Sequence, residues 1–272
     1  MTANERHPLQ HYPSGSAVLL PPQLWGSVAF YATAAMYPAA LIDTRMRFDK
    51  RLKSAHRYAI ADTRGRLDLT VPVSHPAADT PRDWEHTLVS PHGRWWEVHR
   101  TALESAYGRT PFFEFYIDRL APLFSEDVCG RSVGALVTAA DGTIRAILGL
   151  APAAQTVSES ALTNQALTAT DMPAGDTTVN DMPAKAICAG DTIAQIHDLR
   201  RCDFTALPCP RRYWQVRGDV LGFIDRLSIL DLIFNLGPEA PLYLCADSHH
   251  EFSATPRPTE KKSLPLSPHE LG

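Results

Sequence analysis

The sequence predicts a mixed α/β fold in which a β-α-β unit opens a mostly parallel sheet, a hairpin is added, and a helical half is built on two aromatic helices. Three observations support this prediction. Two short apolar runs, Val18–Leu20 and Leu41–Asp43, flank a segment of helical length, as in a strand-helix-strand unit. Two runs between residues 58 and 73 have the alternation of a hairpin. Residues 94–116 hold seven aromatic side chains, out of 5 Trp, 8 Tyr and 10 Phe in the whole chain.

The opening unit begins with the strand Val18–Leu20, which Pro21-Pro22 should end because proline lacks the N–H that a sheet requires. Residues 24–37 are too apolar for a solvated helix and therefore predict a buried one. A strand at residues 41–43 would then lie parallel to the first strand. Open α/β sheets bind ligands beyond the carboxyl ends of their strands, so we expect the turn at residues 21–25 to lie beside a ligand.

Residues 45–58 form a dense basic run that contains six Lys or Arg. A run of charge is commonly a solvated surface, and this interpretation stays open. The alternative is a clamp for a phosphate or a carboxylate, because the guanidinium group of Arg donates two parallel hydrogen bonds to such anions. Under this alternative we expect Arg51, His56 and Arg57 to bind substrate.

The hairpin is predicted from Tyr58–Asp62 and Leu67–Val73, two runs with a period of two. Pro72 removes one backbone donor and therefore favours an edge strand or a strand end. Thr87–Ser90 predicts one more short strand before the aromatic segment.

The aromatic segment predicts a helix that starts at Ser90-Pro91 and ends at Gly108, which we expect to adopt a positive φ. The apolar face of this helix carries Trp96, His99, Leu103, Ala106 and Tyr107. A second helix is expected over residues 112–124, and its inward residues are Phe113, Tyr116, Ile117 and Leu120.

This aromatic stripe is either core or the wall of a pocket. Polar residues interleaved with the rings favour the pocket, because buried polar groups need partners; these residues are His92, Arg94, His99 and Arg109. In the pocket interpretation Trp95, Tyr107 and Arg109 bind substrate. His92 or His99 is then the general base, since an imidazole near its ordinary pKa accepts a proton at neutral pH.

The middle of the chain changes in composition. Residues 128–150 predict one short helix and one strand, joined by a turn at Asp141–Thr143. Residues 152–191 lack aromatic side chains and are dominated by small and polar residues, which predicts a low-complexity insertion that cannot offset its chain entropy. The predicted organisation is a single domain (17–245) that this insertion interrupts, between disordered termini (1–16 and 246–272).

A last helix is predicted over residues 225–236, with Gly237-Pro238 as its end. Asp231 and Asn235 lie one turn apart in it and therefore share a direction. They form either an exposed polar stripe or a pair that faces the aromatic helix, where Asp231 would be catalytic, Asn235 would bind substrate, and Asp231 would pair with a cation. The candidate cations are Arg94, His99 and Arg109.

Composition argues against several functions. The net charge of −4 leaves no basic field for nucleic acid. The sequence has no run of about 20 apolar residues and no apolar signal-peptide core near its start, so a cytoplasmic location without a transmembrane segment is expected. Five cysteines, an odd number, indicate reduced thiols. The spacing of His and Cys matches no metal motif, so no metal site is predicted, and the sequence names neither a cofactor nor an oligomeric state.

Two blocks resemble the WbqC-like family of bacterial proteins: RTPFFEFY at Arg109–Tyr116, after the aromatic helix, and LSILDLIFNLGPE at Leu227–Glu239. The resemblance covers residues 18–125 and 210–245. It implies a transferase of O-antigen or other envelope polysaccharide biosynthesis, which moves glycine or another aminoacyl group onto a nucleotide-activated or surface sugar. Many family members have a His-Gln-Pro-x-Tyr-x-Pro turn after the first strand, whereas this chain has Leu20–Trp25 there, without a histidine.

Two functions therefore stay open. The first is a transferase with a small-molecule or nucleotide-sugar substrate. The second is a non-catalytic binding or assembly module of the same pathway, which the missing histidine and the lack of a strong nucleophile motif favour. Convergence of His92, His99, Arg57 and Asp231 in one concave site would favour the enzyme, and scattered positions would favour the module.

Overall fold

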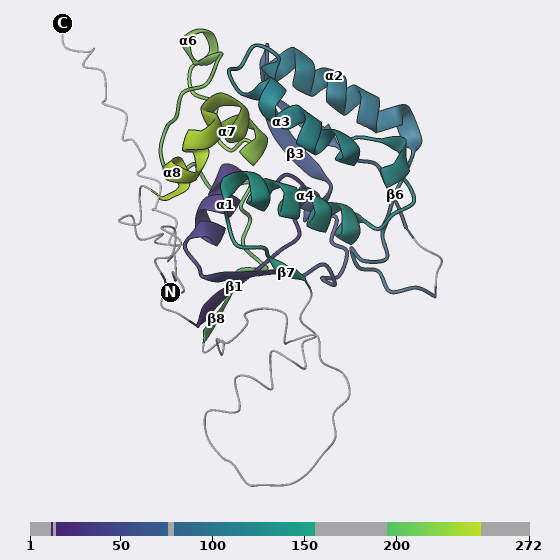
Figure 1. Cartoon of the computed structure of the whole chain (residues 1–272). Coiled ribbons are helices and arrows are strands. Elements are labelled where there is room, and N and C mark those ends of the chain that lie inside the picture. Colours follow the sequence, from purple (N-terminus) through teal and green to yellow (C-terminus); the bar gives the residue numbers. More distant parts are fainter. Residues whose placement is uncertain (1–11, 13–14, 76–78, 156–194, 246–272) are drawn as a thin grey trace, which may run out of the picture.

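A computed structural model describes residues 12, 15–75, 79–155 and 195–245 (Figure 1). The predicted C-terminal tail and residues 156–191 of the predicted insertion lie outside these residues. The described part of the predicted N-terminal tail is attached to the domain. The backbone N–H of Tyr12 donates to the carbonyl of Met36 at 3.0 Å, and Ser16 begins the first strand.

The predicted β-α-β unit is present. It consists of β1 (Ser16–Leu20), α1 (Val28–Ala35) and β2 (Ala39–Ile42), and the two strands are parallel. Two short strands that the sequence analysis did not predict, β7 (Ala154–Gln155) and β8 (Gln195–Asp198), complete a sheet with the order β7-β2-β1-β8. All three pairings are parallel, which confirms the mixed α/β class with a parallel sheet.

The sheet has two apolar faces, because side chains alternate along each strand. Val18, Leu20, Ala40 and Ile42 belong to the main core, and α1 and α4 lie over that side of the sheet (Figure 1). Ala17, Leu19, Ala39 and Leu41 form a second buried cluster on the opposite face.

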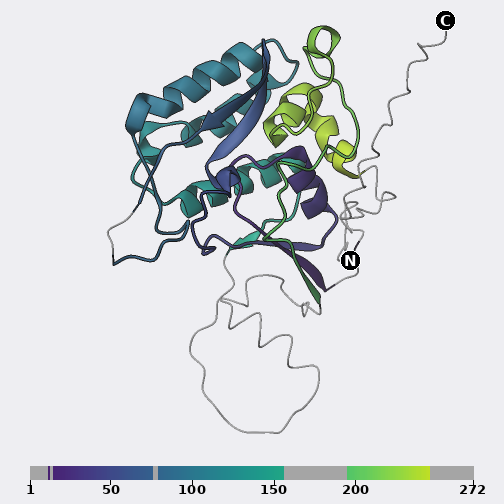
Figure 2. The same ribbon diagram turned by 180° about the vertical axis from the view of Figure 1, so that it is seen from behind.

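The predicted hairpin is also confirmed. It consists of β3 (Arg57–Asp62) and β4 (Gly65–Thr70), which pair antiparallel as a sheet of their own. The second predicted run is interrupted before Pro72, and the chain continues as β5 (Val73–Ser74), which pairs with β6 (Leu88–Val89). The short helix η1 (Lys53–Ala55) precedes β3. The hairpin lies against α2 in both views of the molecule (Figures 1 and 2).

The aromatic helix pair is present as α2 (Trp95–Tyr107) and α3 (Phe113–Leu120), with the single turns η2 (His92–Arg94) before and η3 (Ala121–Leu123) after them. All five residues predicted for the apolar face of α2 are buried. The expected positive φ at Gly108 is wrong, since its φ is −57°. The hydroxyl of Thr110 instead caps α2 by donating to the carbonyl of Tyr107 at 2.7 Å.

The prediction for residues 128–150 is wrong. After the turn η4 (Glu126–Val128), one long helix, α4 (Val133–Leu148), runs through the expected turn at Asp141–Thr143. The helical spacing of its apolar residues explains the result, because that face is buried while Gly142 is exposed. One glycine costs a helix about 1 kcal/mol, less than the burial of several aliphatic side chains contributes.

The C-terminal helices are α6 (Gly218–Leu221), α7 (Ile229–Leu236), the single turn η6 (Gly237–Glu239) and α8 (Ala240–Cys245). The predicted end of α7 at Gly237 is confirmed, with a φ of +52°. α7 packs on α1, α3 and β3, so the second family-like block contacts the first inside the core.

Candidate functional site

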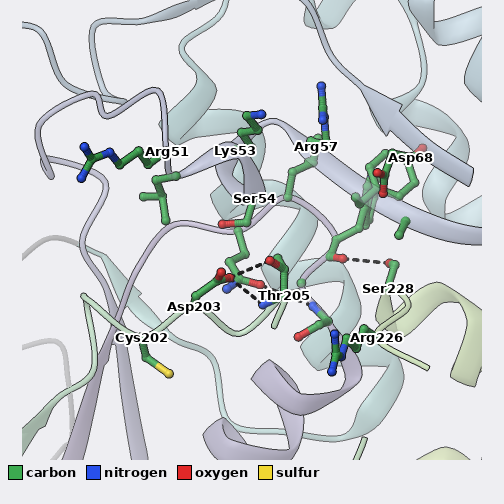
Figure 3. Close-up of a pocket in the computed structure, with 18 of the residues that line it drawn as sticks. Arg51, Lys53, Ser54, Arg57, Asp68, Cys202, Asp203, Thr205, Arg226 and Ser228 are labelled. Carbon is green, nitrogen blue, oxygen red and sulfur yellow. Dashed lines mark hydrogen bonds between the residues drawn. The ribbon is translucent and has the colours of Figure 1, made fainter. Parts of the chain in front are cut away.

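A pocket of about 1120 Å³ lies at the carboxyl edge of the parallel sheet (Figure 3). The segments that follow β1, β2 and β8 all contribute to it, and residues of the hairpin and of the loop before α7 complete it. Gln23, Leu24 and Trp25 are among its lining residues, so the turn after β1 lies where the strand order predicts a ligand. The carbonyl of Ser54 accepts the Leu24 N–H at 2.9 Å and thereby joins this turn to the basic run.

The lining of the pocket is rich in cations although the chain carries a net charge of −4. Eight Lys or Arg line it: Lys50, Arg51, Lys53, Arg57, Arg66, Arg200, Arg201 and Arg226. Its carboxylates are Asp49, Asp68 and Asp203. Half of the cations come from the basic run at residues 45–58, so the anion-clamp interpretation of that run gains support over the solvated surface.

Two of these cations form ion pairs with carboxylates of the protein itself. Arg200 donates to Asp198 at 2.8 Å and to Asp43 at 2.9 Å, and so ties the carboxyl end of β8 to that of β2. Both hydrogen bonds raise the pKa of the Arg200 guanidinium, and the bond to Asp198 has the larger effect. Arg66 pairs with Asp68 at 3.1 Å.

The other six cations make no ion pair with any carboxylate in the described part of the chain. Within the described residues the Arg57 side chain is hydrogen-bonded only through its Nε, which donates to the Thr70 hydroxyl at 2.8 Å. Its two terminal nitrogens are therefore available to an anion. Charge of one sign gathered in a cleft attracts ligands of the opposite sign.

Two helix N-termini add positive potential at the same place. The N-cap residues of α1 and α7, Ser27 and Ser228, both line the pocket. The first-turn N–H groups of Val28 and Ile229 are bonded to the carbonyls of Leu227 and Gly26. The helices therefore contribute mainly through their dipoles, whose positive ends lie at the N-termini.

The backbone is strained at two positions in the pocket. Trp25 and Arg226 have positive φ values of 47° and 60°, and among the described residues that are not glycine only Arg94 shares this feature. Such conformations cost of the order of 1–3 kcal/mol and gather at functional sites. Their presence here is consistent with a site that is built for a ligand.

Of the residues that the sequence analysis selected, Arg51 and Arg57 line the pocket. His99 does not line the pocket itself, but it contacts a residue that does. Its Nδ1 is 3.1 Å from the hydroxyl of the lining residue Tyr58. Burial lowers the pKa of His99 to about 4, so its ring is neutral at pH 7. The Trp95 ring packs against His99 with centroids 5.2 Å apart.

Asp231 is fully buried, with 0% of its surface exposed. It does face the aromatic helix, but the predicted cation partner is wrong. Its oxygens accept hydrogen bonds from Tyr107 at 2.9 Å, Tyr213 at 2.6 Å and Gln215 at 2.9 Å. Burial raises the pKa of Asp231, and these hydrogen bonds act in the opposite direction. Asn235 extends the network by accepting the backbone N–H of Val216 at 2.9 Å.

The remaining selected residues lie elsewhere. His92 and Arg109 are exposed and do not line the pocket. The His56 Nδ1 is 3.0 Å from the Val71 carbonyl, and burial lowers the pKa of His56. The convergence of His92, His99, Arg57 and Asp231 that would favour the enzyme is therefore not found, because only Arg57 lines the pocket.

The segment after β8 also contributes to the pocket, and this contribution was not predicted from the sequence. Arg201, Cys202, Asp203 and Thr205 all line the pocket, and the pair Arg200-Arg201 in an acidic chain was the available signal. Burial, followed by the nearby Asp203, raises the pKa of the Cys202 thiol, so it is protonated at neutral pH. The Asp203 Oδ1 accepts both the hydroxyl and the backbone N–H of Thr205, at 2.6 and 3.0 Å.

In the described part of the chain, no group of three or more His, Cys, Asp and Glu side chains is arranged to hold a metal ion. None of the described helices has the length and apolarity that crossing a bilayer requires.

Comparison with known proteins places the chain in a family. The model of the WbqC-like protein family matches residues 44–243, from just after β2 into α8. No curated protein and no solved structure matches the chain. The match includes both sequence blocks, the basic run and the segment after β8, and the chain belongs to the WbqC-like protein family.

Proposed function

We propose that this protein is a cytoplasmic group transferase of bacterial envelope polysaccharide biosynthesis, O-antigen included, and that its pocket binds a nucleotide-activated sugar. One observation carries the proposal: six cations without an ion-pair partner in the described residues surround a pocket at the carboxyl edge of a parallel sheet. Arg51 and Arg57 hold phosphate groups in this proposal, because charge-assisted hydrogen bonds to phosphate are about twice as strong as neutral ones.

The transferred group is glycine or another aminoacyl group, as the family resemblance implies. A sugar hydroxyl bonds to the carbonyl carbon of the activated donor, and the bond from that carbon to the leaving group breaks. The hydroxyl proton passes to the carboxylate of Asp203, whose Oδ2 has no hydrogen-bond partner in the described residues. Asp203 takes this role because His92, His99 and Asp231 do not line the pocket.

The second candidate is a non-catalytic binding or assembly module of the same pathway. The observation that favours it is the scatter of the predicted acid-base residues, of which one is exposed and two are buried away from the pocket lining. In this function the pocket still binds the anionic ligand but performs no chemistry.

A thermal-shift panel of nucleotide-sugars and activated amino acids tests both candidates. A ligand at 100 times its Kd stabilises a protein by about 2.7 kcal/mol, which gives a measurable shift. We expect a shift for nucleotide-sugars that the double variant Arg51→Gln, Arg57→Gln loses. The matched control Arg109→Gln removes an exposed cation outside the pocket and should keep the shift.

The two candidates differ in turnover. Mass spectrometry of a mixture of the bound sugar nucleotide and an activated glycine should show an aminoacylated sugar if the protein is the transferase. Binding without product would favour the module. If no compound of the panel shifted the melting temperature, both candidates would be rejected.

A further inference from the structure

We propose that the pocket recognises a diphosphate and does not read the nucleobase attached to it. This inference rests on the proposed function, because it names which part of a nucleotide-activated ligand the pocket selects. The chemical class of the ligand is therefore a sugar linked through a diphosphate, with any base.

The cations of the pocket lie on two opposite sides of it. Arg51, Lys53 and Arg57 lie along one side of the pocket, and Arg226 lies on the opposite side (Figure 3). The two groups come from chain segments far apart in sequence, one that ends at the first residue of β3 and the other before α7. A single phosphate is small beside a space of about 1120 Å³, whereas a diphosphate has two anionic groups that cations from the two segments can share.

The lining of the pocket carries an excess of positive charge. The lining holds eight cations and three carboxylates, Asp68 among them, and two further carboxylates, Asp43 and Asp198, pair with Arg200, which leaves an excess of three positive charges. The positive ends of α1 and α7 add to this excess. A phosphate monoester carries a charge of about −2 at most, and a diphosphate between a sugar and a nucleoside carries the same total, one charge on each phosphate. The excess of positive charge therefore indicates an anionic ligand, and the spread of the cations over two sides of the pocket favours the diphosphate.

The described lining of the pocket offers no stacking surface to a nucleobase. Proteins that bind bases without reading their edges usually stack them on exposed aromatic rings. The aromatic residues in the pocket lining are Trp25 and Tyr58, and they are only 2% and 5% exposed. Trp25 stacks on Phe124 with centroids 5.3 Å apart, and the Tyr58 ring meets His99 edge-on. Neither ring presents a face to a ligand, so a nucleobase has no platform here.

Calorimetric titration with five probes at one fixed ionic strength tests the inference: inorganic phosphate, pyrophosphate, CMP, UDP and GDP. We expect pyrophosphate, UDP and GDP to bind about 10-fold or more tightly than phosphate and CMP, because each further charge-assisted contact contributes that much. UDP and GDP should differ by less than about 3-fold, a difference too small for a specific base contact.

Variants test the two sides separately. Arg51→Gln and Arg226→Gln should each lower the affinity for pyrophosphate about 10-fold and bring it close to that for phosphate. Arg109→Gln should leave it unchanged. These residues are exposed, and unchanged melting temperatures without ligand would show that the variants fold.

Several results would overturn the inference. Equal affinity for phosphate and pyrophosphate would reject the diphosphate, and a 10-fold preference between UDP and GDP would reject base tolerance. An Arg226→Gln variant that bound pyrophosphate with unchanged affinity would show that the side of the pocket with Arg226 does not contact the diphosphate. Any of these results leaves the proposed function standing, provided that nucleotide-sugars bind. Failure of all five probes and of nucleotide-sugars would reject both.

Discussion

At the scale of single residues, His99 shows how burial changes the role of a side chain. It is 2% exposed, lies edge-on to Trp95 and Tyr58, and has its Nδ1 next to the Tyr58 hydroxyl. An exposed imidazole would exchange protons near pH 6.5, whereas burial holds the pKa of this ring at about 4. His99 therefore positions Tyr58 in the pocket wall at neutral pH.

The lowered pKa of His99 predicts a pH dependence of stability. Below pH 6.5 the unfolded chain binds a proton at this residue, and the folded chain does not do so until about pH 4. Stability is therefore complete above pH 6.5 and is lost as the pH falls towards 4, by about 3 kcal/mol at most. Urea unfolding between pH 4 and 7.5 should show this slope reduced in His99→Gln.

The control for this experiment is His92→Gln, which changes an exposed histidine and should keep the slope of the parent protein. His56 contributes in the same direction, because burial also lowers its pKa, so part of the slope should remain in His99→Gln. An undiminished slope in that variant would contradict the prediction.

At the scale of elements, the junction between α3 and α7 depends on Gly237. This glycine has a φ of +52°, and a Cβ atom added to it would overlap the ring of Phe112. The backbone N–H of Phe112 also donates to the carbonyl of Phe234 at 3.3 Å. The close approach therefore joins the two sequence blocks that carry the family resemblance.

Gly237→Ala should lower the free energy of unfolding by about 2–5 kcal/mol, because strain in the backbone adds to overpacking against Phe112. Chemical denaturation with a fitted midpoint would measure the change. Gly142→Ala is the matched control, since Gly142 is exposed inside α4 with no atom near an added Cβ. That substitution should raise stability by up to about 1 kcal/mol. Equal effects of the two changes would refute this account.

At the scale of the whole molecule, the prediction concerns the segment that joins β7 to β8, which lie at opposite edges of the sheet. The composition of residues 156–188 predicts that the domain does not need them. Replacing them by a Gly/Ser linker of about twelve residues should change the melting temperature by only a few degrees, since closing a shorter loop costs no more entropy. A large drop would show that the segment stabilises the domain.

The family resemblance, the β-α-β opening, the hairpin, the aromatic helix and the end of α7 were all predictable from the sequence, although the aromatic helix begins at Trp95 and not at the predicted Ser90-Pro91. Each of them depends on a pattern within a few neighbouring residues: two apolar runs around a helix, a period of two, an apolar helical face, or a Gly-Pro pair. The basic run at residues 45–58 was predictable as a candidate anion clamp for the same reason.

Only the tertiary structure decided what these elements meet. The short strand β8 forms because it pairs with β1, and β7 forms because it pairs with β2. Runs of two or four residues carry almost no local signal of a strand. Asp231 was expected to need a cation, but two tyrosines and a glutamine from distant segments satisfy it. The pocket likewise gathers Arg201 and Arg226 beside the basic run. Contacts between distant segments depend on how whole elements pack, and no pattern along the chain records that.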